Sequence, residues 1–85
     1  MFYYTYIIQS TKFSDKFYYG YTSDLCKRLE NHNKGQSRHT SKYVPWSFVF
    51  FAAFPTMKLA KDFEKYLKSA SGRAFLKKRL ISMVK

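Results

Sequence analysis

The chain has 85 residues, a length that fits one domain with its own apolar core, so we expect residues 1–85 to form a single domain. Sixteen Lys and Arg against five Asp and Glu give a formal charge of +11 at pH 7, which favours a polyanion such as nucleic acid as partner. The basic residues recur along the whole chain, which argues against an amphipathic membrane-surface segment. No apolar run approaches the length of a membrane span, and the N-terminus does not resemble a signal peptide. The one cysteine, Cys26, cannot form an internal disulfide. We therefore expect a cytoplasmic protein.

The first half of the chain predicts a β-hairpin followed by a helix. Residues 2–9 and 17–22 are dense in aromatic and β-branched side chains, and the polar stretch 10–16 between them predicts a turn. A helix is expected to run from a cap at Ser23 or Asp24 to about Asn33, and Gly35 follows as a stop signal.

The second half predicts a loop, a third strand and two helices. Residues 34–43 are polar without periodicity, whereas the run FVFFAAF within 47–54 predicts a strand buried on both faces or at the sheet centre. Thr56 is expected to cap a helix running to about Ser69, whose apolar stripe comprises Leu59, Phe63, Tyr66 and Leu67. Ser71-Gly72 is expected to break this helix. The last helix then spans 73–83, with Phe75, Leu76, Leu80 and Met83 inward and Arg73, Lys77, Lys78 and Arg79 outward. The predicted fold class is α+β, a three-stranded, mainly antiparallel sheet flanked by helices in the order β-β-α-β-α-α.

Several polar side chains can converge on one face of this sheet. Alternation places Tyr4 and Tyr6 on the same face of the first strand, and a hairpin can bring Tyr6 beside Tyr18. Arg28 and His32 are four residues apart, so they share one edge of the following helix. Gly20 has no Cβ and offers a place where a backbone or a ligand can approach closely.

These residues carry a resemblance to a known family. Tyr18-Tyr19-Gly20, then Arg28 and His32, resemble the second half of the GIY-YIG nuclease signature, and Tyr4-Thr5-Tyr6 resembles a degenerate first triplet. Glu64, in the run AKDFEKYLK, falls where the family keeps its metal-binding glutamate. The likeness spans roughly residues 2–68 and is greatest to the small stand-alone bacterial members, which are similar to the N-terminal part of an excinuclease. Because the first triplet lacks the Gly and Ile of the family, Tyr4 and Tyr6 are both candidates for its tyrosine.

The resemblance implies a site and a cofactor. Tyr6 would be the general base, Tyr18 would hydrogen-bond the phosphate or the water, Arg28 would clamp the phosphate oxygens, and His32 would orient or relay the proton. Glu64 would hold one Mg²⁺ or Mn²⁺ ion. The composition agrees independently, because five acidic residues are too few for the carboxylate cluster of a two-metal nuclease.

The leading hypothesis is therefore a divalent-metal-dependent DNA endonuclease, structure-selective and linked to repair or recombination. Five residues are expected to contact DNA: Gly20, Lys27, Lys34, Arg38 and Lys42. A protein partner that presents the DNA is a further expectation, and the oligomeric state is open. Two alternatives stand beside it. One is a non-catalytic basic nucleic-acid-binding module with the same fold. The other is an RNA- or ribosome-associated basic protein outside the family, in which Tyr6, Tyr18, Arg28 and Glu64 do not meet in space.

Overall fold

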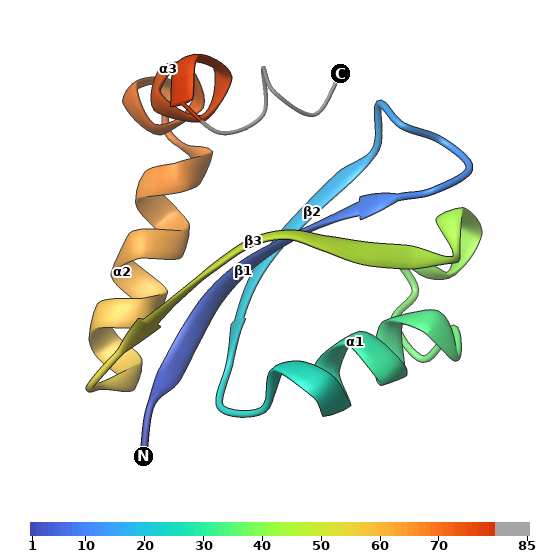
Figure 1. The fold of residues 1–85 in the computed structure, drawn as a ribbon, viewed down its shortest axis with the longest axis horizontal. Coiled ribbons are helices and arrows are strands. Elements are labelled where there is room, and N and C mark those ends of the chain that lie inside the picture. Colours follow the sequence, from blue (N-terminus) through green and yellow to red (C-terminus); the bar gives the residue numbers. More distant parts are fainter. Residues whose placement is uncertain (80–85) are drawn as a thin grey trace.

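A computed structural model describes residues 1–79 of the chain (Figure 1). Strand β1 (Tyr3–Ser10) and strand β2 (Phe17–Thr22) form the predicted hairpin, and helix α1 (Leu25–Asn33) follows. A single 3₁₀ turn, η1 (Ser41–Tyr43), precedes strand β3 (Trp46–Phe54), and the chain continues into helices α2 (Met57–Lys68) and α3 (Ala70–Arg79). The predicted order of elements is confirmed. In the part of the chain that the structure describes, no helix is long and apolar enough to cross a membrane.

The sheet is antiparallel throughout, with strand order β2-β1-β3, which confirms the predicted fold class. The central strand is β1, where the side chains from Thr5 to Ile8 are all buried. The prediction that the third strand is the buried one was wrong. Strand β3 lies at an edge and its pattern is mixed, with the Phe51 side chain 54% exposed.

Two small cores lie on opposite faces of the sheet, because successive side chains of β1 point to opposite sides. Figure 1 shows α1 on one side of the sheet and α2 on the other. Tyr6 and Ile8 pack with Trp46 on the α1 side, against the half-buried leucines of α1. On the other side, Ile7 packs against Leu67 of α2 and Leu76 of α3. The face of β1 that carries Tyr6 is therefore the face that α1 covers.

The C-terminal helices differ from the prediction in where they divide. The break lies at Ser69, whose extended backbone ends α2. The Ser69 hydroxyl accepts a hydrogen bond from the N–H of Gly72, the third residue of α3. Gly72 does not break a helix; a Cβ there would overlap the carbonyl oxygen of Tyr66, so the glycine permits close packing of α3 on α2.

Three side chains predicted to face inward are exposed instead: Leu59, Tyr66 and Phe75. The buried positions of α2 are Ala60 and Leu67. Phe63 is half-buried against the second core and Leu76 is buried, as predicted. The predictions for the side chains of Arg79, Leu80 and Met83 fall outside what the structure describes.

Candidate active site

The phenol of Tyr6 lies across Gly20. The two residues are partners in the β1–β2 register, and Tyr6 is fully buried. A Cβ on Gly20 would come to 2.5 Å from Tyr6 Oη, closer than real Cβ contacts allow. The close approach that the sequence predicts at Gly20 is therefore made by the tyrosine ring. Gly20 matters here because it leaves room for that ring.

Substitution Gly20→Ala should displace Tyr6. We expect it to destabilise the protein by about 1–3 kcal/mol, the usual cost of overpacking a close contact, and to perturb the Tyr6 and His32 ring signals. Urea unfolding and aromatic NMR spectra measure the two effects. A variant as stable as the wild type with an unchanged spectrum of these rings would show that the phenol does not lie where the structure has it.

Tyr6 holds two neighbours from helix α1. Arg28 Nε donates a hydrogen bond to Tyr6 Oη at 3.1 Å, and His32 Nε2 lies 2.9 Å from the same oxygen. The helix places them one turn apart on the edge that faces β1, and Asp24 fixes its start by accepting a hydrogen bond from the N–H of Lys27. The structure thus brings Tyr6, Arg28 and His32 together, as the spacing predicts.

Tyr18 completes this group, whereas Tyr4 stays outside it. The ring of Tyr18 has its centroid 4.9 Å from that of His32 and 6.4 Å from that of Tyr6. Tyr4 instead contacts Phe51 edge-on, with 6.5 Å between ring centroids. Of the two tyrosines that the sequence left open, Tyr6 is the one that lies against the arginine and the histidine.

Sequence reasoning missed Thr40, which holds the far side of the imidazole. His32 Nδ1 lies 2.8 Å from Thr40 Oγ1, and both side chains are buried. Trp46 Nε1 donates to the Thr40 carbonyl oxygen at 2.8 Å, and the side chain of Asn33 exchanges two hydrogen bonds with the Trp46 backbone. Thr40 sits in a polar loop without periodicity, so no pattern in the sequence singles it out.

The hydrogen-bond network is compatible with a His32 imidazole that is protonated on Nδ1. The Arg28 nitrogen can only donate, so Tyr6 Oη accepts from it and can give its own proton to His32 Nε2. A neutral imidazole then carries its proton on Nδ1 and donates it to Thr40 Oγ1. Every buried side-chain polar atom within residues 1–79 has a hydrogen-bond partner.

Removing the Thr40 hydroxyl should leave the buried imidazole without a partner. We expect Thr40→Val to lower the free energy of unfolding by about 1–3 kcal/mol. Thr40→Ser keeps the oxygen and should lie closer to the wild type. Urea unfolding of the wild type and the two variants measures these free energies. Equal stability of the valine and serine variants would mean that the hydrogen bond between Thr40 and His32 contributes nothing to stability.

Burial and the arginine charge set the ionisation of the group. Burial raises the pKa of Tyr6, which the hydrogen bond and the charge of Arg28 partly oppose. Burial lowers the pKa of His32, and the Arg28 charge lowers it further. The hydrogen bond to Tyr6 is the main cause that raises the pKa of Arg28. At neutral pH the site therefore holds a neutral phenol, a neutral imidazole and a guanidinium ion.

Glu64 is near this group but does not hydrogen-bond it. Its side chain is only 12% exposed, and its negative charge is one of the causes that raise the pKa of Tyr6. Its carboxylate Oε2 pairs with Lys68 Nζ at 2.7 Å, one turn along α2. No cluster of three or more His, Cys, Asp or Glu that could hold a metal occurs within residues 1–79. A single carboxylate fits Mg²⁺, which keeps several waters when bound, although Lys68 competes for the same oxygen.

The family is shown by comparison with known proteins. A family model described as the GIY-YIG catalytic domain matches residues 2–79. The chain belongs to the GIY-YIG family. UPF0213 proteins from Streptococcus pyogenes serotype M5 (strain Manfredo) and serotype M1 are each 34% identical to this GIY-YIG chain over 58 residues, which are 67% of this chain and 63% of theirs. The match therefore covers less than two thirds of these relatives.

A solved structure has the same fold. The solution NMR structure of a UPF0213 protein from Bacillus halodurans aligns with a TM-score of 0.51 and 29% identity, covering 89% of this chain and 82% of that one. The GIY-YIG domain indicates a nuclease superfamily that acts on DNA and generally uses divalent metal ions. The hypothesis of a basic protein outside the family was wrong.

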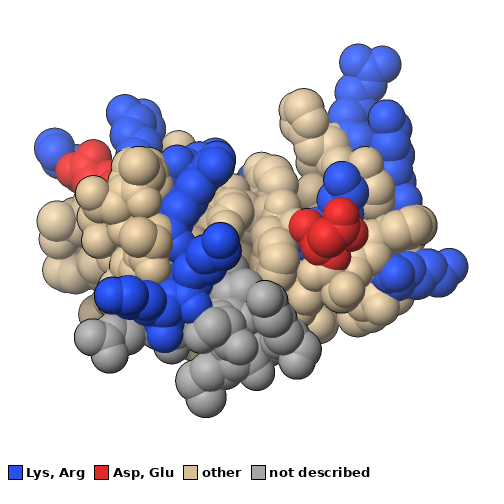
Figure 2. Space-filling view, turned by 90° about the horizontal axis from the view of Figure 1, so that it is seen from above, with Lys and Arg blue, Asp and Glu red and all other residues tan. Residues whose placement is uncertain are grey.

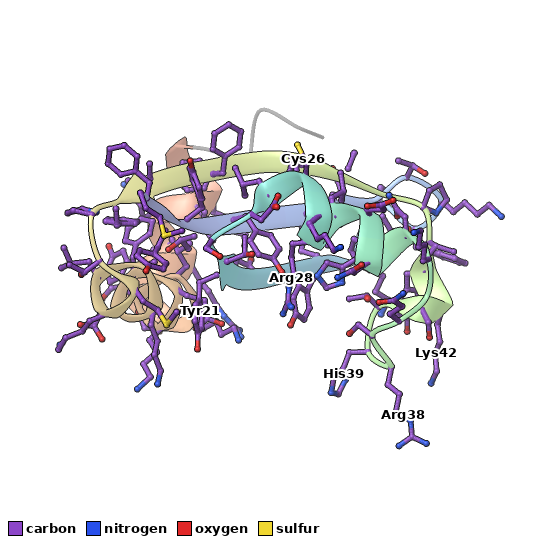
Figure 3. All side chains as sticks on the ribbon, turned by 90° about the horizontal axis from the view of Figure 1, so that it is seen from below. Tyr21, Cys26, Arg28, Arg38, His39 and Lys42 are labelled. Carbon is purple, nitrogen blue, oxygen red and sulfur yellow. The ribbon has the colours of Figure 1, made fainter. Side chains whose placement is uncertain are left out.

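The basic residues expected to contact DNA lie on the surface of the GIY-YIG domain. Lys27, Lys34, Arg38 and Lys42 are all solvent-accessible, and Lys34 pairs with Glu30 at 3.2 Å. Seen from above, Lys and Arg side chains stand out on both sides of the molecule, and acidic side chains form only small patches (Figure 2). Arg38 and Lys42 project from the loop beyond α1, on the same side of the molecule as Arg28 (Figure 3). Their contact with DNA stays a prediction.

Proposed function

We propose that this protein is a divalent-metal-dependent endonuclease that hydrolyses phosphodiester bonds in DNA. The observation that carries the proposal is the position of Tyr6 Oη, shared between the Arg28 guanidinium at 3.1 Å and the His32 imidazole at 2.9 Å. A hydroxyl held between a fixed cation and a neutral proton acceptor is suited to take a proton from water.

The proton path follows from the ionisation states. Tyr6 is fully buried, so the proposed step requires a water molecule to enter beside the exposed Arg28. This water gives its proton to the phenol oxygen, while the phenol gives its own proton to His32 Nε2. The resulting hydroxide attacks the phosphorus, and the bond to the leaving oxygen breaks. Because His32 takes the phenol proton in the same step, a phenolate need not form beforehand, even though burial raises the pKa of Tyr6. Thr40 accepts from His32 Nδ1 and keeps Nε2 facing the phenol.

The remaining residues act on the phosphate and the leaving group. Arg28 is exposed, so its guanidinium can reach two non-bridging oxygens while Nε holds Tyr6. Tyr18, half-buried beside His32, would hydrogen-bond the phosphate or the water. Glu64 would hold the divalent ion, Mg²⁺ or Mn²⁺, which when bound supplies positive charge that stabilises the leaving oxygen.

We further propose structure-selective cutting, in a cytoplasmic protein of DNA repair or recombination. The exposed cations are suited to phosphates, and phosphate contacts position a nucleic acid without reading its sequence. A partner protein that presents the DNA is compatible with so small a domain. Mapping the cuts on branched substrates of different sequence tests this: positions that follow the junction support it, and positions that follow a sequence overturn it.

The experiment for the nuclease itself is cleavage of labelled linear, nicked, flapped and four-way-junction DNA with Mg²⁺ or Mn²⁺. Wild-type protein should cut at least one substrate, and a chelator should stop it. Arg28→Ala should lose activity, whereas Lys58→Ala, which removes an exposed cation that pairs with Asp62 on α2, should not. Full activity of the Arg28 variant would contradict the proposed role of the guanidinium.

One observation favours the alternative of a non-catalytic binding module. The Lys68 ammonium sits on the Glu64 carboxylate that the metal would need. If the ion cannot displace it, the domain binds DNA without cutting. Binding with a steep salt dependence and no turnover on any substrate, with either ion, would support this alternative.

The rate of cleavage should depend on the protonation of His32. The imidazole must be neutral to accept the phenol proton, and its pKa lies below the ordinary value of 6.5. We therefore expect kcat/KM to rise with pH through a midpoint below 6.5 and to be level at neutral pH. A midpoint of this rise in kcat/KM above 6.5 would contradict the assignment of His32.

The same shift makes the folded state bind this proton less readily than the unfolded state, so stability should fall as pH drops below 6.5.

A further inference from the structure

A pocket of about 410 Å³ opens directly beside the candidate active site. It lies between the start of β2, the segment before β3, and α2, which contributes Lys68. Two of its lining residues, Tyr18 and Thr40, are contacts of His32. Whatever fills this pocket is therefore a neighbour of the phosphate that the site would cut.

The lining combines aromatic rings with cations. Tyr18 and Tyr43 are half-buried and line the pocket, and the buried Trp46 lines it too. Lys16 Nζ lies 5.4 Å from the centroid of the Tyr43 ring, and Lys68 also lines the pocket. Among the residues that the structure describes, no acidic side chain lines it. Rings that can stack and ammonium groups that attract anions match the two halves of a nucleotide.

A second hollow, of about 690 Å³, continues from the first. It is lined by Arg38, Ser41 and Lys42, and it shares His39 and Tyr43 with the pocket described above. Figure 3 shows Arg38, His39 and Lys42 extending to the same side of the molecule as Arg28. The basic surface thus runs from the active site, past the aromatic pocket, to the tip of the loop.

We propose that the aromatic pocket binds an unpaired nucleotide of the strand being cut, next to the scissile phosphate. Its base stacks on Tyr43 and Tyr18, its phosphates lie at Lys16 and Lys68, and the strand continues to Arg38 and Lys42. A base inside a duplex has both faces stacked and cannot enter a side pocket, so the substrate carries single-stranded DNA at the cut, as in a flap, an overhang or a gap. This inference rests on the proposed nuclease function, because it takes the strand bound in the pocket to be the strand that the active site cuts.

Binding without metal tests the pocket separately from the chemistry. Fluorescence anisotropy with a short single-stranded oligonucleotide and with the same sequence as a blunt duplex should show tighter binding of the single strand, by about 5-fold or more. Lys16→Ala and Tyr43→Leu should weaken single-strand binding, whereas Lys58→Ala should have a much smaller effect. Since Tyr43 packs against the core, thermal unfolding of that variant is measured alongside.

Abasic substitution of the DNA needs no variant of the protein. Removing single bases in turn from the unpaired arm of a flapped substrate should weaken binding about 5-fold or more at one position beside the junction, and little elsewhere. Equal affinity for single strand and duplex, with no sensitive position, would overturn the pocket even if the protein cuts DNA. A sensitive position with no cleavage of any DNA would instead refute the nuclease and leave the pocket standing.

Discussion

Replacing Tyr6 with phenylalanine is expected to slow DNA cleavage by about 10²–10⁴-fold, the usual contribution of a general acid–base group. The substitution removes only the hydroxyl that lies between Arg28 and His32, and the ring still fills the space over Gly20. The fold and the affinity for DNA should therefore persist. Single-turnover cleavage with saturating protein measures the chemical step without a contribution from binding.

Tyr4→Phe is the matched control for this prediction. Tyr4 lies two residues away on the same strand but contacts Phe51 instead of the polar group. Its phenylalanine variant should cut DNA at nearly the wild-type rate. If Tyr4→Phe is inactive and Tyr6→Phe cuts DNA, the general base is Tyr4 and the hydrogen bonds of Tyr6 are structural.

Replacing Glu64 with glutamine is expected to slow metal-dependent cleavage on the order of 10²–10³-fold or more. Glutamine keeps the shape of the side chain but removes the charge that a divalent ion requires. It also frees Lys68 from its ion pair, at small cost in stability because the lysine is half exposed. The rate at increasing Mg²⁺ concentration measures the effect.

Asp62→Asn controls for a generic loss of negative charge on α2. Asp62 lies half a turn before Glu64 and pairs with Lys58 at the exposed surface. We expect this variant to keep both its rate and its metal dependence. A Glu64→Gln protein that cuts with normal Mg²⁺ dependence would mean that the ion is held elsewhere or is not needed.

Local patterns predicted that Tyr18, Arg28 and His32 can meet a tyrosine of the first strand, but they left Tyr4 and Tyr6 as alternatives. The hairpin follows from alternation with a polar turn, and it fixes that Tyr6 and Tyr18 share a face. Arg28 and His32 are four residues apart on a capped helix, so they share one edge of α1. All four residues come from one continuous stretch of about one third of the chain, so few long-range choices separate the pattern from the site.

Long-range packing decided what the sequence could not show. Strands β1 and β3 are both aromatic-rich apolar runs, and only the pairing of β1 with both neighbours makes it the central strand. The contact of Thr40 with His32 depends on the path of the loop between α1 and β3. Gly72 resembles a helix breaker in the sequence, but it allows α3 to pack closely on the end of α2. Each of these depends on a partner that is distant or not marked by any local pattern.

The most direct test of the central claim, that Tyr6 and Glu64 belong to one nuclease site, is a single-turnover comparison of four proteins on one labelled DNA. These are the wild type, Tyr6→Phe, Glu64→Gln and the double variant. Residues that act as a unit are strongly non-additive. We predict that each single variant cuts at least about 10²-fold more slowly than the wild type, and that the double variant is no slower than the slower single variant. Wild-type rates in either single variant would contradict the account.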